Sequence, residues 1–504
     1  MLGEAELLLV VVGFLIAFVS AFGLGANDVA NSFGTSVGSK VLTLRQACIL
    51  ATICEIAGSV LLGGHVSATI RGGIIDPTQF NGTADGAVRL MQGQVSSLIG
   101  SCAWMLLATF LRIPVSATHS IVGATAGFGL VLFGIDGIQW KGIFKIVGSW
   151  FLSPVLSGLV SSTLYLIIKY TVLVKENSLE PALNTLPFLY AITIFINVFS
   201  VLFGGLKMLN LPEISIWTIL GAAAGCGLAG GLAVHFIGRP IIRRKVHARL
   251  SGKGNTSSSK KTFNLSCLTQ CRERMEAFFS HETNATGPQA APKTETTIPP
   301  KSDADDVEMQ NIQETENTAT NKSSKVVGRD GQVCDRPEEA EVFAFAQILT
   351  ATFGSFVHGG NDVANAIGPV MGLWMVATTG DVLMKVAPKV WILFYGGIGI
   401  SVGLWVWGRK VMQTIGHDLT EITPTTGMCI ELGAAITVLI ASKAGLPVST
   451  THCLVGSVVF VGCFRERQSV NWKLFVGIAF AWMVTLPVSC GISSLTMYLF
   501  TVFG

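Results

Sequence analysis

The sequence predicts an all-α, polytopic membrane protein built from two inverted repeats, with broken helices and two re-entrant helical hairpins. Three observations lead to this fold class. Half of the 504 residues are hydrophobic and only 13% are charged, the mean hydropathy is +0.58, and two motifs occur twice along the chain in the same order. This composition lies far outside the usual range of soluble globular proteins. We therefore expect the chain to lie in a lipid bilayer.

Several apolar segments suit the span of a membrane helix, which takes about 18 residues or more. The clearest are residues 7–24, 44–62, 142–168, 188–203 and 216–237. Glu4 and Glu6 precede the first segment in place of Lys or Arg, and no convincing cleavage site follows, so we interpret it as a retained helix. The formal net charge of +3 is small and gives no reason to expect a nucleic-acid partner.

The hydrophobic pattern stops at Arg239 and resumes near Val342. We therefore divide the chain into a first membrane block at 1–238 (repeat 1 plus additional helices), a hydrophilic linker at 239–340 and a second membrane block at 341–504 (repeat 2). The linker is rich in Ser, Thr, Asn, Lys and Glu, so we expect it to be disordered. Its basic beginning, with Arg243 and Arg244, places it in the cytoplasm. It serves either as a solvated spacer or as a regulatory or lipid-headgroup contact.

The two membrane blocks share sequence motifs. GANDVAN at 25–31 returns as GGNDVAN at 359–365, with six of seven positions identical, and PVSATH at 114–119 returns as PVSTTH at 447–452. The separations are 334 and 333 residues. Two unrelated motifs that recur at nearly one offset indicate a duplicated fold.

The orientation of the first block follows from its polar loops. Asn81 begins an Asn-Gly-Thr sequon, so we expect glycosylation at Asn81 and an outer location for that loop. Lys40 and Arg45 then lie inside, as does the basic start of the linker. The number of crossings between these points must be even, so residues 95–133 contribute no net crossing and are predicted to form a re-entrant hairpin. Its turn falls at 112–116, where Pro114 disfavours helix in the preceding residue.

The same reasoning places the second hairpin on the opposite face of the membrane. Arg409, Lys410, Arg465 and Arg467 flank it and fit an inside location. Two hairpins that enter from opposite faces make an inverted repeat, in which a transporter binds its cargo near the midplane between half-helices.

The first repeated motif supplies intramembrane amide and carboxyl groups. They are Asn27, Asp28 and Asn31 in the first block and Asn361, Asp362 and Asn365 in the second. Glycines around the motif suggest an interrupted helix, and freed backbone groups in a bilayer need a partner such as a bound ion. Carboxylate and amide oxygens suit Na⁺, whereas N–H groups at a helix start suit an anion. The alternative is that these side chains only bond neighbouring helices.

The second repeated motif places hydroxyl groups where each hairpin helix begins. These are Ser116, Thr118, Ser449, Thr450 and Thr451. They can donate to the oxygens of an anion, or they can simply cap the returning helix, and the two roles are compatible. His119 and His452 follow in the same motif and either donate to the anion, carry a proton or pack as hydrogen-bonded histidines.

Two further carboxylates lie in apolar segments. Glu55 and Glu431 are costly to bury without a cation, and they do not fall at the repeat offset, so their roles need not be equivalent. Ion coupling and helix-to-helix hydrogen bonding are the alternatives for each. His65 and His358 are weaker candidates, with His358 favoured by its place before the second motif. The sequence has neither a P-loop nor a Cys/His cluster, so we expect no ATP-driven transport, no resident metal and no cofactor.

On both motifs and on TLRQACIL at 43–50, the chain closely resembles the inorganic phosphate transporter (PiT) family, and in particular its animal sodium-dependent members. The resemblance covers everything except the linker. It implies symport of inorganic phosphate with Na⁺ by alternating access in the plasma membrane, an extracellular amino terminus and a cytoplasmic central loop. A phosphate sensor that signals through the linker and a channel are the alternative functions. A homo-oligomer is also left open, because small-residue packing motifs serve contacts within a chain too.

The resemblance also assigns roles to residues. It implies importance for Asp28, Glu55, Asp362 and Glu431 as Na⁺-coupling groups. Phosphate is expected at the hairpin hydroxyls and the repeated polar motif, which are Asn27, Asp28, Asn31, Ser116, Thr118, His119, Asn361, Asp362, Asn365, Ser449, Thr450 and Thr451.

Overall fold

The computed structural model describes residues 3–28, 30–64, 67, 72–83, 85–205, 214–250, 335–384, 389–408, 419–465 and 470–503, without the side chains of 30, 31, 204, 205, 249 and 250. One structural unit comprises residues 1–246 and 325–504. A second comprises 247–324, of which the structure describes 247–250 at the end of a helix. Everything that follows concerns the first unit.

The described residues are helical almost throughout, and the all-α prediction is confirmed. The only β pairing among them is an isolated bridge between Ile75 and Ile138. The helices of the first block are α1 (Glu4–Asp28), α2 (Ala30–Gly38), α3 (Leu44–Leu62), α5 (Gly86–Phe110), α6 (Ala117–Phe133), α7 (Trp140–Ile168), α8 (Leu179–Ser200), α10 (Ile216–Ala233) and α11 (Arg239–Leu250). The second block holds α13 (Pro337–Thr379), α14 (Val390–Trp407), α16 (Pro424–Lys443), α17 (Thr450–Arg465) and α18 (Trp472–Phe503). They are connected by two short 3-10 helices, η1 (Pro77–Phe80) and η2 (Ile135–Gly137), and extended by three π-helical segments, η3 (Lys169–Leu173), η4 (Val201–Gly205) and η5 (Val234–Gly238).

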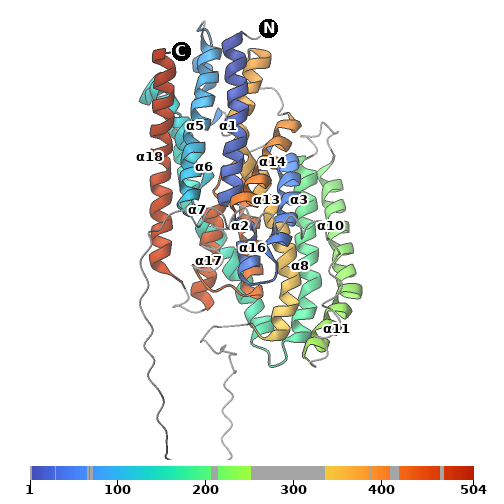
Figure 1. The fold of residues 1–504 in the computed structure, drawn as a ribbon. Helices are drawn as coiled ribbons and strands as arrows, with labels where there is room; N and C mark the ends of the chain where they lie inside the picture. Colours follow the sequence, from blue (N-terminus) through green and yellow to red (C-terminus); the bar gives the residue numbers. More distant parts are fainter. Residues whose placement is uncertain are drawn as a thin grey trace, which may run out of the picture. The chain divides into compact units, whose positions relative to one another are not determined.

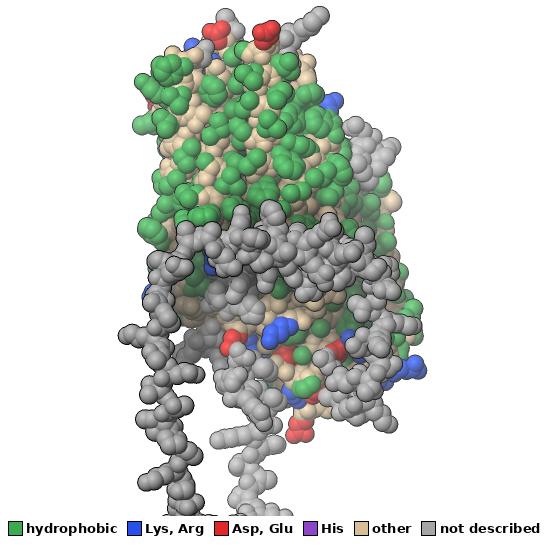
Figure 2. Space-filling view, viewed as in Figure 1, with side chains coloured by type: hydrophobic (Ala, Val, Ile, Leu, Met, Phe, Trp, Pro, Cys, Tyr) green, Lys and Arg blue, Asp and Glu red, His purple; other side chains and the backbone are tan. Residues whose placement is uncertain are grey.

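The helices are those of a polytopic membrane protein. Within the described part of the chain, ten helical segments are long and apolar enough to cross a bilayer, whereas α6 and α17 are shorter. Figure 2 shows hydrophobic side chains covering the upper part of the visible face, with charged side chains at its upper edge and toward its lower end. Large apolar groups such as Phe151, Trp217 and Met483 are mostly exposed. A wide apolar surface between two charged ends is what a bilayer requires.

Two pairs of helices occupy opposite ends of the bundle. In Figure 1 both termini lie at one end, α5 and α6 lie toward that end, and α16 and α17 lie toward the other. Each shorter helix packs on the long helix of the other block, with α6 against α18 and α17 against α7. The short helix of each block therefore packs against the other block, and we call this arrangement exchanged packing.

Equivalent glycines permit this exchanged packing. A Cβ on Gly123 of α6 would lie 2.4 Å from the carbonyl oxygen of Leu486 in α18, and a Cβ on Gly456 of α17 would lie 2.3 Å from that of Pro154 in α7. Both glycines sit at the repeat offset of 333 residues. Small residues let membrane helices approach closely, because van der Waals contact replaces the hydrophobic effect as the packing force in lipid.

The prediction that both polar motifs break their helices is wrong for the second block. Helix α13 continues through Asn361 and Asp362 without interruption over 43 residues. The physical reason is that these side chains find partners in neighbouring groups of the helix and in a hairpin loop, so the helical backbone need not open. In the first block α1 ends at Asp28 and α2 begins at Ala30, and Val29 between them lies outside the described residues. That break stays a prediction.

The edges of the expected linker also differ from the prediction of disorder. Its first residues form α11, and residues 337–340 already belong to α13. Ion pairs explain this order, because Arg239 and Arg243 both bond Glu180 of α8 and Lys245 pairs with Glu341 of α13. The rest of the linker lies outside the described residues.

We predict that Gly456→Ala destabilises the protein. The added methyl group would overlap the Pro154 carbonyl oxygen, and such overpacking costs about 1–3 kcal/mol. Gly491→Ala is the matched control, because nothing lies within 4 Å of the added group and alanine is the better helix former. The measurement is the thermal unfolding temperature in detergent. An equal response of the two variants would contradict the close helix contact.

Candidate functional site

The two hairpin tips are built alike. Two residues after α5 ends, Arg112 has φ 61°, and two residues after α16 ends, Gly445 has φ 67°. The next amides bond back five residues, Ile113 N to Ala108 O at 2.9 Å and Leu446 N to Ala441 O at 3.0 Å. A left-handed residue followed by this bond is a common helix termination. The chain therefore turns at the two places that the prolines predicted.

Serines cap the returning helices. The hydroxyl of Ser116 accepts from His119 N at 3.3 Å, and that of Ser449 accepts from His452 N at 3.2 Å. A capping serine satisfies one of the free amides in the first turn. The capping alternative is confirmed for both serines.

An asparagine from each motif clamps the tip of its own block. Asn27 donates to Ile113 O at 3.0 Å and to Thr109 Oγ1 at 3.1 Å, and its oxygen accepts from Val115 N at 3.1 Å. Asn361 donates to Val448 O at 3.0 Å and accepts from Ser442 Oγ at 2.8 Å. The amides thus fix the unpaired backbone of the two turns to α1 and α13.

Buried acidic groups converge beside these clamps. Oxygens of Asp28 and Asp362 and a nitrogen of His358 lie within 4.8 Å of one another. His358 Nε2 is 3.0 Å from Asp362 Oδ2, and its Nδ1 is 2.9 Å from Glu55 Oε2. All four side chains are at most 3% exposed. Three carboxyl groups thus share one imidazole away from water, and so close a cluster favours a bound cation or proton.

Hydroxyls from the tips reach this cluster. Thr450 Oγ1 donates to Asp362 Oδ2 at 2.6 Å, and Thr451 Oγ1 donates to Asp28 Oδ1 at 3.1 Å. Asn365 donates to Asp362 Oδ1 at 2.8 Å and to Thr118 Oγ1 at 3.2 Å. The structure therefore brings together most of the predicted residues, from four segments far apart in the chain.

Glu431 forms a separate cluster. Its carboxylate accepts from Ser36 Oγ at 2.7 Å, from Thr350 Oγ1 at 2.6 Å, from Gln347 Nε2 at 3.4 Å and from the Thr35 hydroxyl. None of these donors carries a charge. A carboxylate ringed by side-chain oxygens is a donor set suited to a hard cation such as Na⁺.

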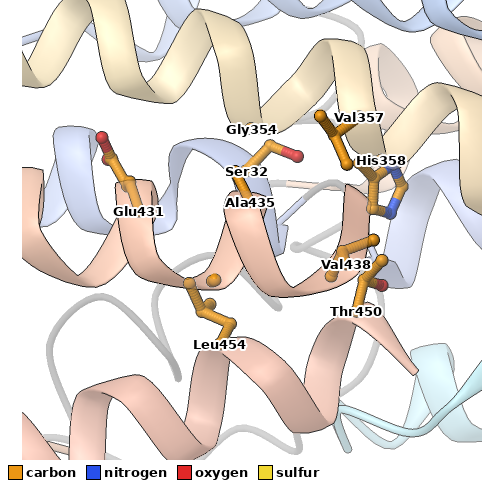
Figure 3. A pocket seen from close by; sticks show the side chains of 10 residues that line it. Ser32, Gly354, Val357, His358, Glu431, Ala435, Val438, Thr450 and Leu454 are labelled. Atoms are coloured by element: carbon orange, nitrogen blue, oxygen red, sulfur yellow. The ribbon is translucent and has the colours of Figure 1, made fainter. Parts of the chain in front are cut away.

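A cavity of about 30 Å³ joins the two clusters. In Figure 3, His358 and Thr450 lie at one end of it and Glu431 lies at the other, with Ser32 and Leu454 between them. Its walls include apolar side chains of α13 and α16 and the hydroxyls of Ser32 and Thr450. The space suits one or two small species the size of water.

Other predicted residues lie elsewhere. His119 contacts Trp150 and Trp482. Asn81 is exposed at the end of η1, where glycosylation stays a prediction. The side chain of Asn31 and the whole of His65 lie outside the described residues.

Sequence reasoning missed the partners of the two glutamates. Ser355 donates to Glu55 Oε1 at 2.8 Å, and Gln347 and Thr350 bond Glu431. A signal was present in α13, because Gln347, Thr350, His358 and Asp362 recur at helical spacings of three, eight and four residues. Polar groups along one face of an otherwise apolar helix indicate a polar seam inside the bundle.

Known proteins are similar to this chain in sequence and in fold. The family model described as "Phosphate transporter family" matches residues 24–493. The chain is 39% identical to sodium-dependent phosphate transporter 2 of Xenopus laevis, over 97% of this chain and 98% of that one. It is 36% identical to sodium-dependent phosphate transporter 1 of Rattus norvegicus, over 98% and 95%. A solved structure titled "The sodium-dependent phosphate transporter" is similar at a TM-score of 0.72 and 31% identity, over 98% of this chain and 100% of that one.

Replacing Asn27 by Leu should loosen the first hairpin tip. The change leaves Ile113 O and Val115 N without their partner, and each buried polar group left unpaired costs about 1–3 kcal/mol. We expect faster hydrogen exchange at residues 113–116, measured by mass spectrometry on the purified protein. Asn197→Leu is the control, because its amide bonds only a carbonyl of its own helix. Unchanged exchange at the tip in the Asn27 variant would refute the clamp.

Proposed function

The chain belongs to the phosphate transporter family, and we propose that it carries inorganic phosphate and Na⁺ together through the site between its two hairpin tips. It is a membrane transporter and not an enzyme. Its function is sodium-dependent phosphate transport, as in its full-length relatives. The observation that carries the mechanism is the meeting of Asp28, Asp362 and the hydroxyls of both tips in one buried cluster.

The same cluster accounts for coupling. An anion cannot enter beside two buried carboxylates without compensation, because like charges repel strongly where water is excluded. Na⁺ bound to Asp28 and Asp362 removes that repulsion. It also takes over the carboxylate oxygens that now accept from Thr450 and Thr451, and the released hydroxyls can donate to phosphate. Phosphate binding therefore requires Na⁺.

The helix starts add attraction for the anion. Helices α6 and α17 both begin at the tips, and Thr118 of one tip bonds Val448 O of the other at 3.3 Å. Their amino-terminal ends thus approach each other, and each end carries a partial positive charge from its first-turn amides. Ser116, Thr118, Ser449, Thr450 and Thr451 are the proposed phosphate contacts. Asn27 and Asn361 hold the tips, and His119, Asn31 and Asn365 remain further candidates.

We propose inverted repeats and re-entrant hairpins as the frame for alternating access. The matching tip geometry, the exchanged packing of α6 and α17, and the opposite ends at which the two hairpins lie (Figure 1) support this arrangement. Helices α5 and α16 are long enough to cross a bilayer, but each turns at its tip and its chain returns. Rocking of one block against the other would then open the tips to one side at a time.

The two glutamates take different parts in Na⁺ coupling. Glu55 is tied to the central cluster through His358, so it senses the charge on Asp362. Glu431 binds its own ion among Thr35, Ser36 and Thr350. The cavity between the clusters supplies a path over which their occupancy is linked.

The location and sidedness complete the proposal. We place the chain in the plasma membrane with its central loop in the cytoplasm and a glycan on the exposed Asn81. The basic residues that begin α11 support the inside assignment. A homo-oligomer stays a prediction.

Asp362→Asn and Asp28→Asn should each abolish Na⁺-dependent phosphate uptake while the protein still reaches the cell surface. An amide keeps the shape and loses the charge that holds the cation. The measurement is radiolabelled phosphate uptake in Na⁺ against choline medium, with sulfate and arsenate as competitors and surface protein quantified. Asp136→Asn, at an exposed position, is the control. Uptake at the wild-type level by Asp362→Asn or Asp28→Asn would contradict the proposed site.

Glu431→Gln should change the Na⁺ dependence of uptake more than its phosphate dependence. Glutamine can accept from the same hydroxyls, but it binds Na⁺ more weakly because it has no charge. We expect the Na⁺ concentration for half-maximal uptake to rise about tenfold, which corresponds to about 1.4 kcal/mol. The exposed Glu421→Gln is the control. An unaltered Na⁺ response would remove Glu431 from coupling.

Transport is distinguished from phosphate sensing by removal of the linker. Deletion of residues 251–334 should leave uptake largely intact, because the central site is built entirely from α1, α3, α13 and the hairpins. The measurement is Na⁺-dependent uptake normalised to surface protein. Loss of uptake with normal surface expression would favour a function that runs through the linker.

A further inference from the structure

Two histidine rings and two tryptophan rings pack together beside the hairpin tips. The ring of His119 of α6 packs at a tilt against that of Trp150 of α7 with ring centres 3.6 Å apart, and the ring of His452 of α17 packs at a tilt against that of Trp482 of α18 at 3.7 Å. The two imidazoles meet edge to face at 4.5 Å. Two of the four rings, Trp150 and Trp482, come from helices that the transport site does not use, and together the four rings tie both hairpins to both long helices.

The hydrogen bonds of this cluster cross between the blocks. His119 Nδ1 lies 3.3 Å from Trp482 O, and His452 Nδ1 lies 3.1 Å from Trp150 O. A carbonyl oxygen only accepts, so Nδ1 carries the proton in both histidines. Each histidine therefore packs its ring against the tryptophan of its own block and donates to the backbone of the tryptophan in the other block.

A proline makes one of these carbonyls available. In a regular helix Trp150 O would accept from the amide of residue 154, but that residue is Pro154, which has no N–H. His452 supplies the missing donor. In α18, Pro487 lies five residues after Trp482, so it does not remove the donor of Trp482 O in the same way. The His452 bond is accordingly the shorter of the two.

The residue before each histidine also reaches across. Thr118 bonds Val448 O and Asn365 of the second block, and Thr451 bonds Asp28 and Val115 O of the first. Successive side chains in a helix project about 100° apart. Fixing the imidazole on one side of a hairpin helix therefore fixes the rotation of that helix, and with it the place of the threonine hydroxyl.

We propose that His452 and His119 are positioning residues, which hold Thr451 and Thr118 at the carboxylates through their bonds to Trp150 O and Trp482 O. This inference rests on the proposed phosphate site. A histidine that served packing alone would need the ring and not the donor. The bond to a carbonyl that Pro154 leaves unpaired, together with the threonine contacts of the same turn, separates positioning from packing.

Two substitutions at His452 separate the donor from the ring. Asparagine places an amide N–H where Nδ1 stands, whereas leucine fills space without a donor. We expect His452→Leu to raise the KM for phosphate about tenfold, as the loss of one buried hydrogen bond would, and His452→Asn to recover most of that loss. Trp150→Phe keeps the carbonyl and an aromatic ring and should transport like the wild type. If Leu and Asn variants both lower surface protein and leave KM unchanged, the histidine is structural and the proposal falls.

Pro154→Ala tests the same bond without touching the histidine or the site. The new amide of residue 154 competes with His452 for Trp150 O, so the KM should rise several-fold. Thermal stability should stay the same or increase, because alanine favours a helix far more than proline does. An unchanged KM in a stable Pro154→Ala protein would overturn the proposal.

Hydrogen exchange at residues 450–453 separates this inference from the proposed function. His452→Leu should speed exchange there in the purified protein, and His452→Asn should restore it. If the wild type took up no phosphate while these exchange effects held, the proposed function would fail and the positioning role would stand. If the wild type transports phosphate but hydrogen exchange at residues 450–453 is the same in both variants as in the wild type, only the positioning role fails.

Discussion

The structure depends on keeping carboxylates close together where water is excluded. Asp28 and Asp362 come from different blocks and are each 1% exposed, and Glu55 joins them through His358. An isolated charge in such a place is very unfavourable. Nearby polar groups satisfy these oxygens, among them the hydroxyls of Thr450 and Thr451 and the amide of Asn365. The surrounding helices hold those donors in place and separate them from lipid.

In the mechanism that we propose, the same constraint gives the site its selectivity for a pair of ions. Without a cation the carboxylates hold the hydroxyls that phosphate would need, so neither ion is well bound alone. With a cation the hydroxyls and the first-turn amides of α6 and α17 become an anion site of neutral donors. In this proposal, coupling follows from competition for one set of hydrogen bonds, whereas alternating access takes the rocking of one block against the other.

The two blocks share a backbone plan but differ in charge. The tips have the same cap, the same serine and the same asparagine clamp, with Thr109 in one block and Ser442 in the other. Of the polar face of α13, only Asp362 has a polar counterpart in α1, which is Asp28. The residues 334 positions earlier than Gln347, Thr350 and His358 are Gly13, Ile16 and Leu24. Two blocks with similar hairpin tips therefore hold one central histidine, His358, and two unlike glutamate clusters. Glu55 and Glu431 accordingly have different hydrogen-bond partners, and a part for either in Na⁺ coupling stays a proposal.

The sequence by itself determined what depends on composition and local pattern. Hydropathy gave the membrane helices, Pro114 and Pro447 marked the turns, and the duplicated motifs identified Asn27, Asp28, Ser116 and their counterparts. Local pattern also misled, because glycines next to Asn361 suggested a broken helix where side-chain bonds keep α13 continuous. Only the tertiary structure decided the pairing of Glu55 with His358 across 303 residues, the ring of hydroxyls around Glu431 and the crossed histidines. The physical reason is that such contacts join separate helices, and a helix repeats its own faces every three to four residues without specifying which neighbour each face will meet.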